Sequence, residues 1–493
     1  MAPASTETGP SAVSTDPRRR WLVLMICCMS VFVVGIDVTI VNVALPSIRH
    51  DLHASVSGLQ WTVDAYTLVI ACLLMLSGSL ADRLGRRRVF QTGLAAFSLG
   101  SLLCSLAPSL GWLVAFRGLQ AVGGSMLNPV AMAIIVNTFT DRKERARAVG
   151  LWGSVVGVSL AAGPVIGGIL VSAVSWRAVF WINVPIGVAA IILTQRFVPE
   201  SKAPRARRFD PAAQALMVVL LASLTYAVIE GPEHGWKSPL ILGLFGFAVV
   251  AAVAFVLVEL RRAEPLIDVR FFRSPPFAGA SFIAVCAFGA LGGFLFLNSL
   301  YLQDVRGYSA LHAGLLTIPM AAMIAIFGAV SGRLVASRGA RPPFLIAGPM
   351  LTIGALLLAR LTTDTSVGYL LVAYVVFGLG FGFVNAPITN TAVSGMPIEQ
   401  AGVAGAVAST SRQIGSSLGV AITGSLVATG VGAGFVTASH AAWLLIAGLG
   451  VAVLVVGLLS TGQRARAAAT RNGTRLAQRA KENADAPPVT AAR

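Results

Sequence analysis

The amino-acid sequence predicts an all-α polytopic membrane protein, and three observations support that fold class. Hydrophobic residues make up 56% of the 493 positions and charged residues only 12%, too few for an ordinary water-soluble surface. The apolar residues gather into long runs, and Lys and Arg are concentrated in alternate connections between those runs. This pattern is typical of helices that cross a bilayer repeatedly, because a helix satisfies its own backbone groups in lipid.

Fourteen apolar runs are long enough to cross a membrane. Each has about 20 residues, the length that spans a hydrocarbon core as a helix, and is bounded by charged or turn residues. The predicted spans cover residues 21–46, 57–81, 89–108, 111–137, 148–173, 178–197, 211–230, 239–260, 276–302, 311–333, 343–361, 367–390, 404–429 and 439–460.

The distribution of Lys and Arg orients these spans. If the N-terminus is inside, the inner segments hold 30 of the 37 Lys and Arg residues, whereas the outer loops hold only four. Because Lys and Arg resist translocation, this asymmetry predicts that both termini are cytoplasmic. The net charge of +17 is therefore mainly a topology signal, with some attraction to anionic lipid, and it does not predict nucleic-acid binding.

Other residue types restrict the classes of function. The five Cys all fall inside predicted spans, which predicts neither a disulfide framework nor a Cys metal site. The five His fall in outer loops or at outer helix ends, without further ligands for a metal. No Gly-x-x-x-x-Gly-Lys-Ser/Thr sequence occurs, so a phosphate-cradling ATPase loop is not expected. We therefore expect no metal, no cofactor and no catalytic residue.

Both ends of the chain are predicted to be cytoplasmic tails. Residues 1–20, rich in Pro, Ser and Thr, are predicted to be disordered, and the span after them is too long for a signal core. Residues 461–493 form a basic tail rich in Ala and Arg. Its composition fits either an amphipathic helix on the inner leaflet or a disordered segment.

An internal repeat organises the chain. The segment 78–88, "GSLADRLGRRR", and the segment 332–342, "GRLVASRGARP", both keep two Gly seven positions apart at an offset of 254 residues. Two further Gly, at 153 and 157, match those at 415 and 419 at an offset of 262. The second span therefore corresponds to the tenth, and the fifth to the thirteenth. Parallel repeats of this kind are a signature of transporters, because two similar halves can rock about a central site.

The repeat predicts the domain boundaries. Residues 21–197 form an N-terminal six-helix bundle and residues 276–460 a C-terminal one. Residues 198–275 form a linker that contributes the seventh and eighth helices.

Four stretches resemble motifs of the major facilitator superfamily and of its fourteen-span drug–proton antiporters. They are "GIDVTIVNVALP" (35–46), "GSLADRLGRRR" (78–88), "AFRGLQAVGGS" (115–125) and "GSVVGVSLAAGPVIGG" (153–168). The resemblance implies the major facilitator fold and a proton-driven exporter of small lipophilic drugs or antibiotics, present as a monomer in a bacterial inner membrane. It does not identify an individual substrate.

The first loop motif is expected to act as a gate. Its glycines permit a tight turn, and its charges can form a cluster or cap a helix end. The resemblance implies that the motif latches the outward-facing closed state by tying the two halves together, whereas a topology signal alone explains Arg87 and Arg88 equally well. In the second copy Ala336 stands where Asp82 would, which weakens any latch there. The predicted gating residues are Gly78, Asp82, Arg83, Gly85 and Arg86.

Small residues are concentrated in the fifth span. They permit close helix packing, and the proline removes a backbone hydrogen bond and gives a kink or swivel. Tight packing alone would explain them, but the resemblance associates this pattern with antiporters and hence with export. The residues are Gly153, Gly157, Gly163, Pro164, Gly167 and Gly168.

Three ionisable residues are predicted inside the membrane. A helical rise places Asp37, Asp64 and Arg117 about 13, 12 and 10 Å below the outer surface, in one layer. Two carboxylates close together resist joint ionisation, and an Arg that moves between them would switch their affinity for protons. We therefore predict that these residues couple export to protons. Asp64 is also explained as a solvated or capping group at the outer end, Arg117 as a structural partner and Asp37 as a core acid that is merely satisfied.

The coupling residues have no counterpart in the second half. Leu291 and Leu371 stand at the 254-residue offset from Asp37 and Arg117. The sequence therefore assigns ion coupling to the first half.

An apolar wall with a few amides is predicted to bind the solute, as suits a lipophilic compound with scattered polar groups. Lipid-facing packing is the alternative for each Phe. Arg412 and Gln413, in "SRQIG", also resemble a family motif, although an Arg there is equally explained by snorkelling to the interface. The predicted cavity residues are Asn42, Gln120, Phe294, Phe296, Asn298, Phe381 and Asn385.

Two alternative functions stay open at this point. One is a dedicated exporter of another small metabolite or a siderophore. The other is an integral-membrane enzyme or sensor, for which a His/Asp or Ser/His cluster at one interface would be expected, and none is visible in the sequence.

Overall fold

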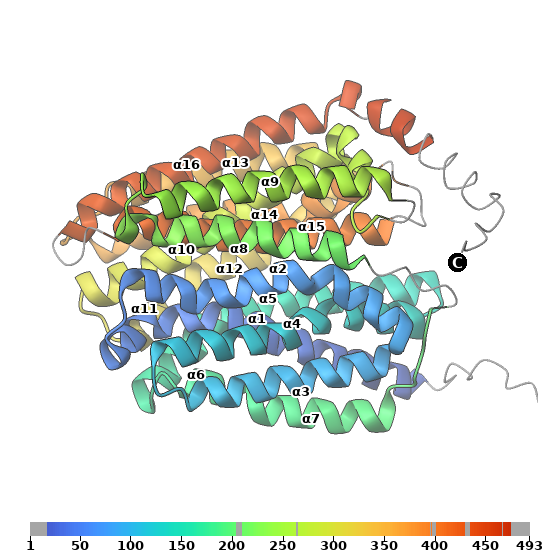
Figure 1. Cartoon of the computed structure of the whole chain (residues 1–493), viewed down its shortest axis with the longest axis horizontal. Coiled ribbons are helices and arrows are strands. Elements are labelled where there is room, and N and C mark those ends of the chain that lie inside the picture. The colour runs from blue at the N-terminus through green and yellow to red at the C-terminus, as the bar shows by residue number, and fades with distance from the viewer. Residues whose placement is uncertain are drawn as a thin grey trace, which may run out of the picture.

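The computed structural model describes residues 17–203, 210–262, 265–394, 396, 401–428, 434–465 and 467–474. All regular secondary structure within these ranges is helical. The helices form two bundles stacked one above the other, α1 to α7 below and α10 to α16 above in Figure 1. The start of α1 and the end of α16 lie at the same end of the molecule (Figure 1).

The N-terminal bundle contains the first six predicted spans. Its helices are α1 (Pro17–Leu52), α2 (Val56–Leu84), α3 (Arg86–Ser105), α4 (Leu110–Thr138), α5 (Arg142–Ala173), and the pair α6 (Ala178–Trp181) and α7 (Asn183–Phe197). Polar residues set several boundaries: Ser55 caps α2 by accepting from Gly58 N, and Asp141 caps α5 in the same way. Gly85 separates α2 from α3. Its φ of 113° is a backbone conformation that residues other than glycine rarely adopt.

The C-terminal bundle contains the last six predicted spans. It comprises α10 (Pro275–Leu300) with a π-helical turn η2 (Tyr301–Val305), α11 (Ala310–Leu316), α12 (Ile318–Arg338), α13 (Arg341–Leu358), α14 (Val367–Val393), α15 (Ala401–Val427) and α16 (Gly434–Ser460). The tenth predicted span is divided at Thr317 into α11 and α12.

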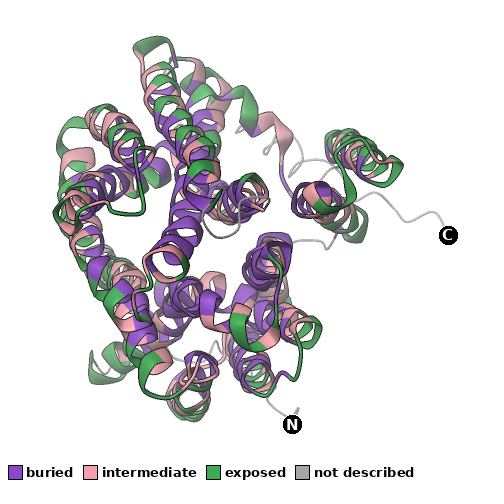
Figure 2. Cartoon of the chain, turned by 90° about the vertical axis from the view of Figure 1, so that its left-hand side faces the viewer, coloured by how far each residue is buried: buried purple, intermediate pink, exposed green. Residues whose placement is uncertain are grey.

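The packing within the two bundles follows the same plan. In the N-terminal bundle α1 packs on α5, α2 on α4, and α3 on both α4 and α7. In the C-terminal bundle α10 packs on α15, α12 on α14, and α13 on both α14 and α16. Figure 2 shows that buried residues face the interior of this assembly while exposed ones face outwards.

Twelve of the described helices are long and apolar enough to span a membrane. The helices α3 and α15, which correspond to the predicted third and thirteenth spans, are not among these twelve because they are less apolar. The reason lies in their composition: α3 begins with three Arg, and α15 carries Arg412 and Gln413 among several Ser and Thr. Both helices nevertheless pack along apolar neighbours, α3 on α4 and α15 on α10.

An inserted helix pair lies beside the two bundles. It consists of α8 (Pro211–His234) and α9 (Pro239–Arg261), followed by the 3-10 turn η1 (Val269–Arg273). Asp210 and Ser238 cap the two helices, and each helix has Pro in its first turn. The outward face of α9 is apolar and exposed, with Val249 and Val250 each 63% accessible, as expected for a face that contacts lipid.

Helix α8 bridges the seam between the bundles, because it packs on α2 of one and α15 of the other. Its polar contacts are with α2. Trp61 Nε1 donates to Glu230 Oε1 at 2.7 Å, and Ser57 Oγ donates to Glu233 Oε1 at 2.7 Å. Its contacts with α15 are apolar and include Ala421.

Candidate functional site

Asp37 and Arg117 form a fully buried ion pair that joins α1 to α4. Arg117 Nη1 lies 2.6 Å from Asp37 Oδ2, and the two side chains are 2% and 0% exposed, respectively. An unpaired charge in hydrocarbon costs at least about 2.5 kcal/mol, so each side chain provides the compensation that the other needs. The structure therefore brings together two of the three charges that the sequence placed in one layer.

Amide side chains complete the hydrogen bonding of the carboxylate. Gln120 Nε2 and Asn183 Nδ2 donate to Asp37 Oδ1 at 2.8 and 3.1 Å. Ser101 Oγ also accepts from both amides, at 2.7 and 3.3 Å. Arg117 Nη1 donates to Gln120 Oε1 at 2.7 Å. Helices α1, α3, α4 and α7 therefore share one buried polar network.

Helix α2 holds the other side of the Arg117 guanidinium. Nε donates to the Thr62 carbonyl at 3.1 Å, and Cζ lies 4.2 Å from the centre of the Tyr66 ring. A cation over an aromatic face in a desolvated site gains about 2 kcal/mol. Tyr66, Ser101 and Asn183 were not predicted from the sequence as residues of this site. For Asn183 a signal existed, because an amide in an apolar span needs a partner when it is buried.

Asp64 does not join this network. It is fully buried, and its side chain faces α15 near Ser417 rather than Asp37. Thr67 Oγ1 lies 3.3 Å from Asp64 Oδ1, while Oδ2 has no hydrogen-bond partner among the described residues. Residues 62 and 64 lie on opposite sides of α2 because successive helical residues are about 100° apart. The expectation that the two carboxylates lie close together with Arg117 between them is therefore not met in this conformation, and burial also excludes the solvated position for Asp64.

The predicted small residues of α5 have three different environments. Gly163 and Gly167 face α1, where a Cβ at Gly163 would overlap the Thr39 hydroxyl and one at Gly167 would lie 2.7 Å from Ile40 Cγ1. They permit the close approach of α5 to the helix that carries Asp37.

Two other members of the set contact the opposite bundle. A Cβ at Gly168 would lie 2.7 Å from the Ala310 carbonyl, and the Pro164 carbonyl packs directly on Gly314. Gly153 and Gly157 instead line the central cavity, where an added Cβ would meet no atom within 4 Å. The motif thus combines helix packing, contact between the bundles and cavity wall.

A central cavity of about 1890 Å³ lies between the bundles. It reaches from Asn42 in α1 to Asn137 at the inner end of α4 and to Asp268 and Arg270 in the connection before α10. The ends of helices that the sequence places inside line its mouth, so in the predicted orientation this conformation is open towards the inner side.

Contacts between the bundles close the outer side. Arg49 Nη1 lies 3.0 Å from Asp304 Oδ2. Gln303 Nε2 donates to the Val43 carbonyl at 3.0 Å, and Leu311 N donates to Ser172 Oγ at 3.1 Å. Each contact joins one bundle to the other, so the halves meet at the outer end.

The predicted gating loop lies at the inner mouth of the cavity. Gly78, Asp82 and Arg86 line it, and Arg86 Nη2 pairs with Asp82 Oδ1 at 3.1 Å. Arg83 is exposed in the last turn of α2. Glu200 accepts hydrogen bonds from two backbone amides at the start of α3, at 3.1 and 3.3 Å, and so ties the loop to the segment after α7.

The predicted substrate residues are divided between the cavity and the protein interior. Asn42, Phe381 and Asn385 line the cavity. Gln120, Phe294, Phe296 and Asn298 do not, and each is at most 3% exposed. Gln120 belongs to the Asp37 network instead.

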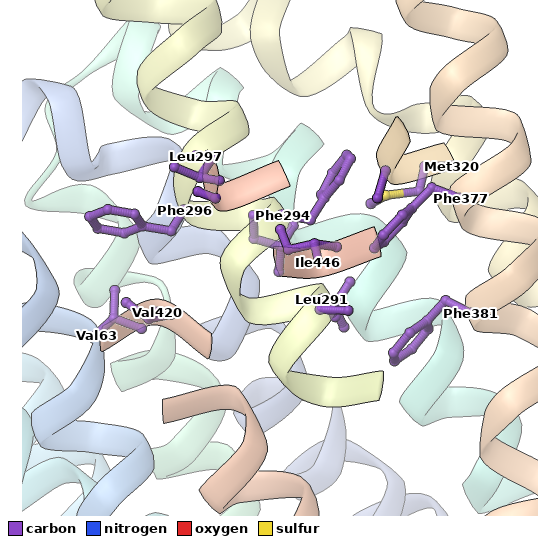
Figure 3. Packing of buried hydrophobic residues seen from close by; sticks show 14 of the residues in the cluster. Val63, Leu291, Phe294, Phe296, Leu297, Met320, Phe377, Phe381, Val420 and Ile446 are labelled. Carbon is purple, nitrogen blue, oxygen red and sulfur yellow. The ribbon is translucent and has the colours of Figure 1, made fainter. Parts of the chain in front are cut away.

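The remaining three were misassigned because residues in apolar spans give no indication of which helix face they occupy. Phe294 stacks on Phe377 at 4.7 Å between ring centres and packs against Trp443, as Figure 3 shows in part. Phe296 lies in the same buried cluster. Asn298 accepts a hydrogen bond from the Tyr374 hydroxyl.

Arg412 and Gln413, by contrast, both line the cavity. The Arg412 side chain therefore faces the central cavity, which differs from snorkelling to the membrane interface. The tail predicted to be disordered, residues 1–20, is shorter than expected, because residues 17–20 form the first turn of α1. Residues 1–16 and the end of the C-terminal tail, residues 475–493, lie outside the described residues.

The chain matches known transporters over most of its length. Residues 27–420 match the Major Facilitator Superfamily. The Multidrug resistance protein Stp of Mycobacterium tuberculosis is 38% identical over 83% of this chain and 76% of that protein. The Tetracenomycin C resistance and export protein of Streptomyces glaucescens is 38% identical over 87% and 81%. The Multidrug efflux pump LfrA of Mycolicibacterium smegmatis is 34% identical over 85% and 83%.

Solved structures share the fold at low identity. A bacterial homolog of the human lysosomal transporter Spinster, in an inward-facing and occupied conformation, gives a TM-score of 0.61 at 18% identity, over 94% of this chain and 99% of that one. A POT family transporter in complex with 5-aminolevulinic acid gives 0.67 at 15%, over 90% and 96%. The family match, these bacterial relatives and the apolar helices together show that the chain belongs to the Major Facilitator Superfamily, as a multi-pass protein of a bacterial inner membrane.

Proposed function

We propose that this protein is a secondary active exporter of small lipophilic drugs or antibiotics, driven by proton antiport. The names of its relatives support export of such compounds, because they include multidrug resistance proteins and an antibiotic export protein. The observation that carries the coupling to protons is the buried Asp37–Arg117 ion pair. It supplies a protonatable group inside the membrane, where proton-driven transporters need one.

The proposed topology has fourteen spans and two cytoplasmic termini. Residues 21–197 and 276–460 form the two bundles, and residues 198–275 contribute the inserted pair. Support comes from the coincidence of α3 and α15 with predicted spans and from their packing along apolar helices. The chain acts as a monomer, because the cavity is built from both bundles of one chain.

Protonation of Asp37 would remove one of the two charges of the ion pair. It neutralises the carboxylate and leaves the Arg117 charge uncompensated at a buried site, which is costly. The guanidinium would then depend on the Gln120 amide, the Thr62 carbonyl and the Tyr66 ring. The deprotonated state thus draws α1 and α4 together, and protonation releases them.

The ion pair lies behind the cavity wall, not in it. Asp37 and Arg117 do not line the cavity, whereas Val38 and Thr39, which follow Asp37 on α1, do. A shift of α1 on protonation would therefore change the wall that the drug contacts, and the drug would not need to touch the carboxylate.

Asp64 is proposed as a second protonatable group, located at the seam that opens to the outside. Next to it, Gln60 Nε2 donates to the Ala421 carbonyl at 2.7 Å and closes α2 against α15. When the halves rock to the outward-open state, this seam separates and Asp64 meets water from the outer side. Protons would then enter from outside, as antiport requires.

Transport by purified protein in liposomes tests this proposal. A proton gradient is imposed with the acidic side at the outer end of the protein. The protein should then move an aromatic drug such as ethidium towards the acidic side, and protons should move in the opposite direction. A pH-sensitive dye in the lumen reports the protons. Drug movement that does not depend on the proton gradient would overturn proton antiport. It would leave the assignment of the chain to a transporter family unchanged.

A dedicated exporter of one compound is the second candidate. It is favoured by the relative named for tetracenomycin C alone. Susceptibility of a pump-deficient bacterial host to a panel of antibiotics separates the two: protection against many unrelated compounds indicates a multidrug pump, and protection against one indicates a dedicated pump.

A further inference from the structure

The charged residues of the cavity wall are not balanced. Five charged side chains of the described residues line the cavity, and four of them lie at its inner mouth as close opposite pairs: Asp82 with Arg86 at 3.1 Å, and Asp268 with Arg270 at 4.0 Å. The fifth is Arg412, which has no ion-pair partner among the described residues. Asp37 and Asp64, which would attract a cationic drug, are both outside the wall.

Arg412 lies well inside the cavity. It follows the first residue of α15 by eleven positions, about 16 Å along the helix axis. Its Nη2 donates to Thr389 Oγ1 of α14 at 2.6 Å and its Nη1 to Ser409 Oγ at 3.4 Å. Both acceptors are neutral hydroxyls, and Nε has no partner among the described residues. A guanidinium has five N–H donors, and after these two bonds Nη1 and Nη2 each keep one for a ligand, whereas Nε is buried.

Aromatic rings lie next to this cation. The Arg412 Cζ atom is 5.8 Å from the centre of the Phe288 ring. Phe288 and Phe381 meet edge to face with their ring centres 5.2 Å apart, and both line the cavity. Asn385, one helical turn before Thr389, adds an exposed amide on the same helix. The wall therefore combines a fixed positive charge with an apolar, aromatic surface.

We propose that Arg412 binds the acidic group of the substrate, and that the preferred substrates are lipophilic acids with an aromatic body and a carboxylate or acidic phenol. This proposal rests on the exporter function proposed above. A guanidinium pairs with a carboxylate through two parallel hydrogen bonds, and in a cavity with apolar walls this pairing is stronger than in water. The aromatic body of the substrate packs on Phe288, which Phe381 supports from behind, and this contact fixes its orientation.

The test compares two probes of almost equal shape, 2-naphthoic acid and 2-naphthamide, in binding to the purified full chain in detergent. Wild-type protein should bind the acid at least about tenfold more tightly than the amide, as expected for a charge-assisted contact. Arg412→Gln should abolish that preference and leave binding of the amide unchanged, whereas Arg412→Lys should keep part of it. Arg270→Gln is the matched control, because it removes a cavity cation that already has a carboxylate partner.

Two further measurements keep the outcome clear. Binding by wild-type protein at a pH at which the probe acid is protonated should show no preference for the acid. This measurement needs no substitution, so it tests the proposal even if Arg412→Gln does not fold. Equal binding of acid and amide by wild type, or a preference that Arg412→Gln retains, would overturn the proposal. The exporter function is judged separately, by gradient-driven transport in liposomes of cationic, neutral and acidic aromatic drugs, because transport of any one of them indicates export and this binding preference needs no transport.

Discussion

The Asp37 carboxylate and the Arg117 guanidinium meet at 2.6 Å in a site with almost no solvent access, and the contact joins α1 to α4 within one bundle. The pair is surrounded by the amides of Gln120 and Asn183, which leave no oxygen of the carboxylate without a donor. A fully satisfied buried network of this kind is rigid, and loss of one charge affects every helix that contributes to it.

Removing one member of the pair should destabilise the protein more than removing both. Arg117→Gln leaves a buried carboxylate without its cation and should cost about 3 to 5 kcal/mol, whereas the double variant Asp37→Asn, Arg117→Gln should recover part of that loss. Thermal unfolding in detergent measures which of the two variants is more stable. Asp51→Asn, which removes the half-exposed partner of Arg177, is the control and should change stability by about 1 kcal/mol or less. A double variant less stable than Arg117→Gln would contradict this account of the pair.

Gly163 and Gly157 provide a matched pair of substitutions on α5. Gly163→Ala places a methyl group on the Thr39 hydroxyl and should force α5 away from α1, lowering stability by about 1 to 3 kcal/mol through overpacking. Gly157→Ala meets no atom within 4 Å and should be neutral or slightly stabilising, because Ala favours a helix. Melting temperatures of the two variants decide the point. If they are equal, close packing is not the reason for Gly at position 163.

A disulfide across the outer contact should trap the inward-open state. Leu311 N lies 3.1 Å from Ser172 Oγ, so cysteines at these two positions are close enough to be joined when the outer side is closed. The oxidised Ser172→Cys, Leu311→Cys protein should lose transport and recover it on reduction. Each single cysteine variant should be insensitive to oxidant, since the five native Cys are buried. Full transport in the oxidised double variant would show that these segments need not separate.

The hydrogen bond between Trp61 and Glu230 should attach α8 to the N-terminal bundle. A bond to a charged acceptor contributes about 1.5 to 3 kcal/mol. In a double-mutant cycle with Trp61→Phe and Glu230→Gln, the coupling energy from thermal or denaturant unfolding should therefore be of that order. Trp112, which is 56% exposed, offers the control pairing with Glu230→Gln and should show no coupling. Purely additive effects of Trp61→Phe and Glu230→Gln would mean that the bond does not hold α8 in place.

The positions of the helices could be predicted from the sequence, whereas the pairing of the buried charges could be predicted only in part. Apolar run length located the helices because membrane thickness fixes that length. Depth along a helix brought Asp37 and Arg117 to one layer, but depth carries no information on which side of a helix a residue faces. Asp64 shares the layer and faces α15 instead.

The cavity wall was less predictable for the same physical reason. In a span that is apolar on all sides, the pattern does not distinguish a face towards lipid, core or cavity. Phe381 and Phe294 each follow a glycine in an apolar span and belong to the same buried cluster, yet only Phe381 also reaches the cavity wall. Arg412 shows the same limit, since the position of a cation along a span does not reveal that it faces the cavity.

The central claim, that Asp37 couples drug export to protons, is tested most directly by Asp37→Asn in liposomes with an imposed proton gradient. The substitution keeps the size of the side chain and removes the proton exchange. We expect drug–drug exchange to continue while gradient-driven drug movement and counter-movement of protons both fall to the level of liposomes without protein. Export at the wild-type rate, with protons still moving, would contradict it.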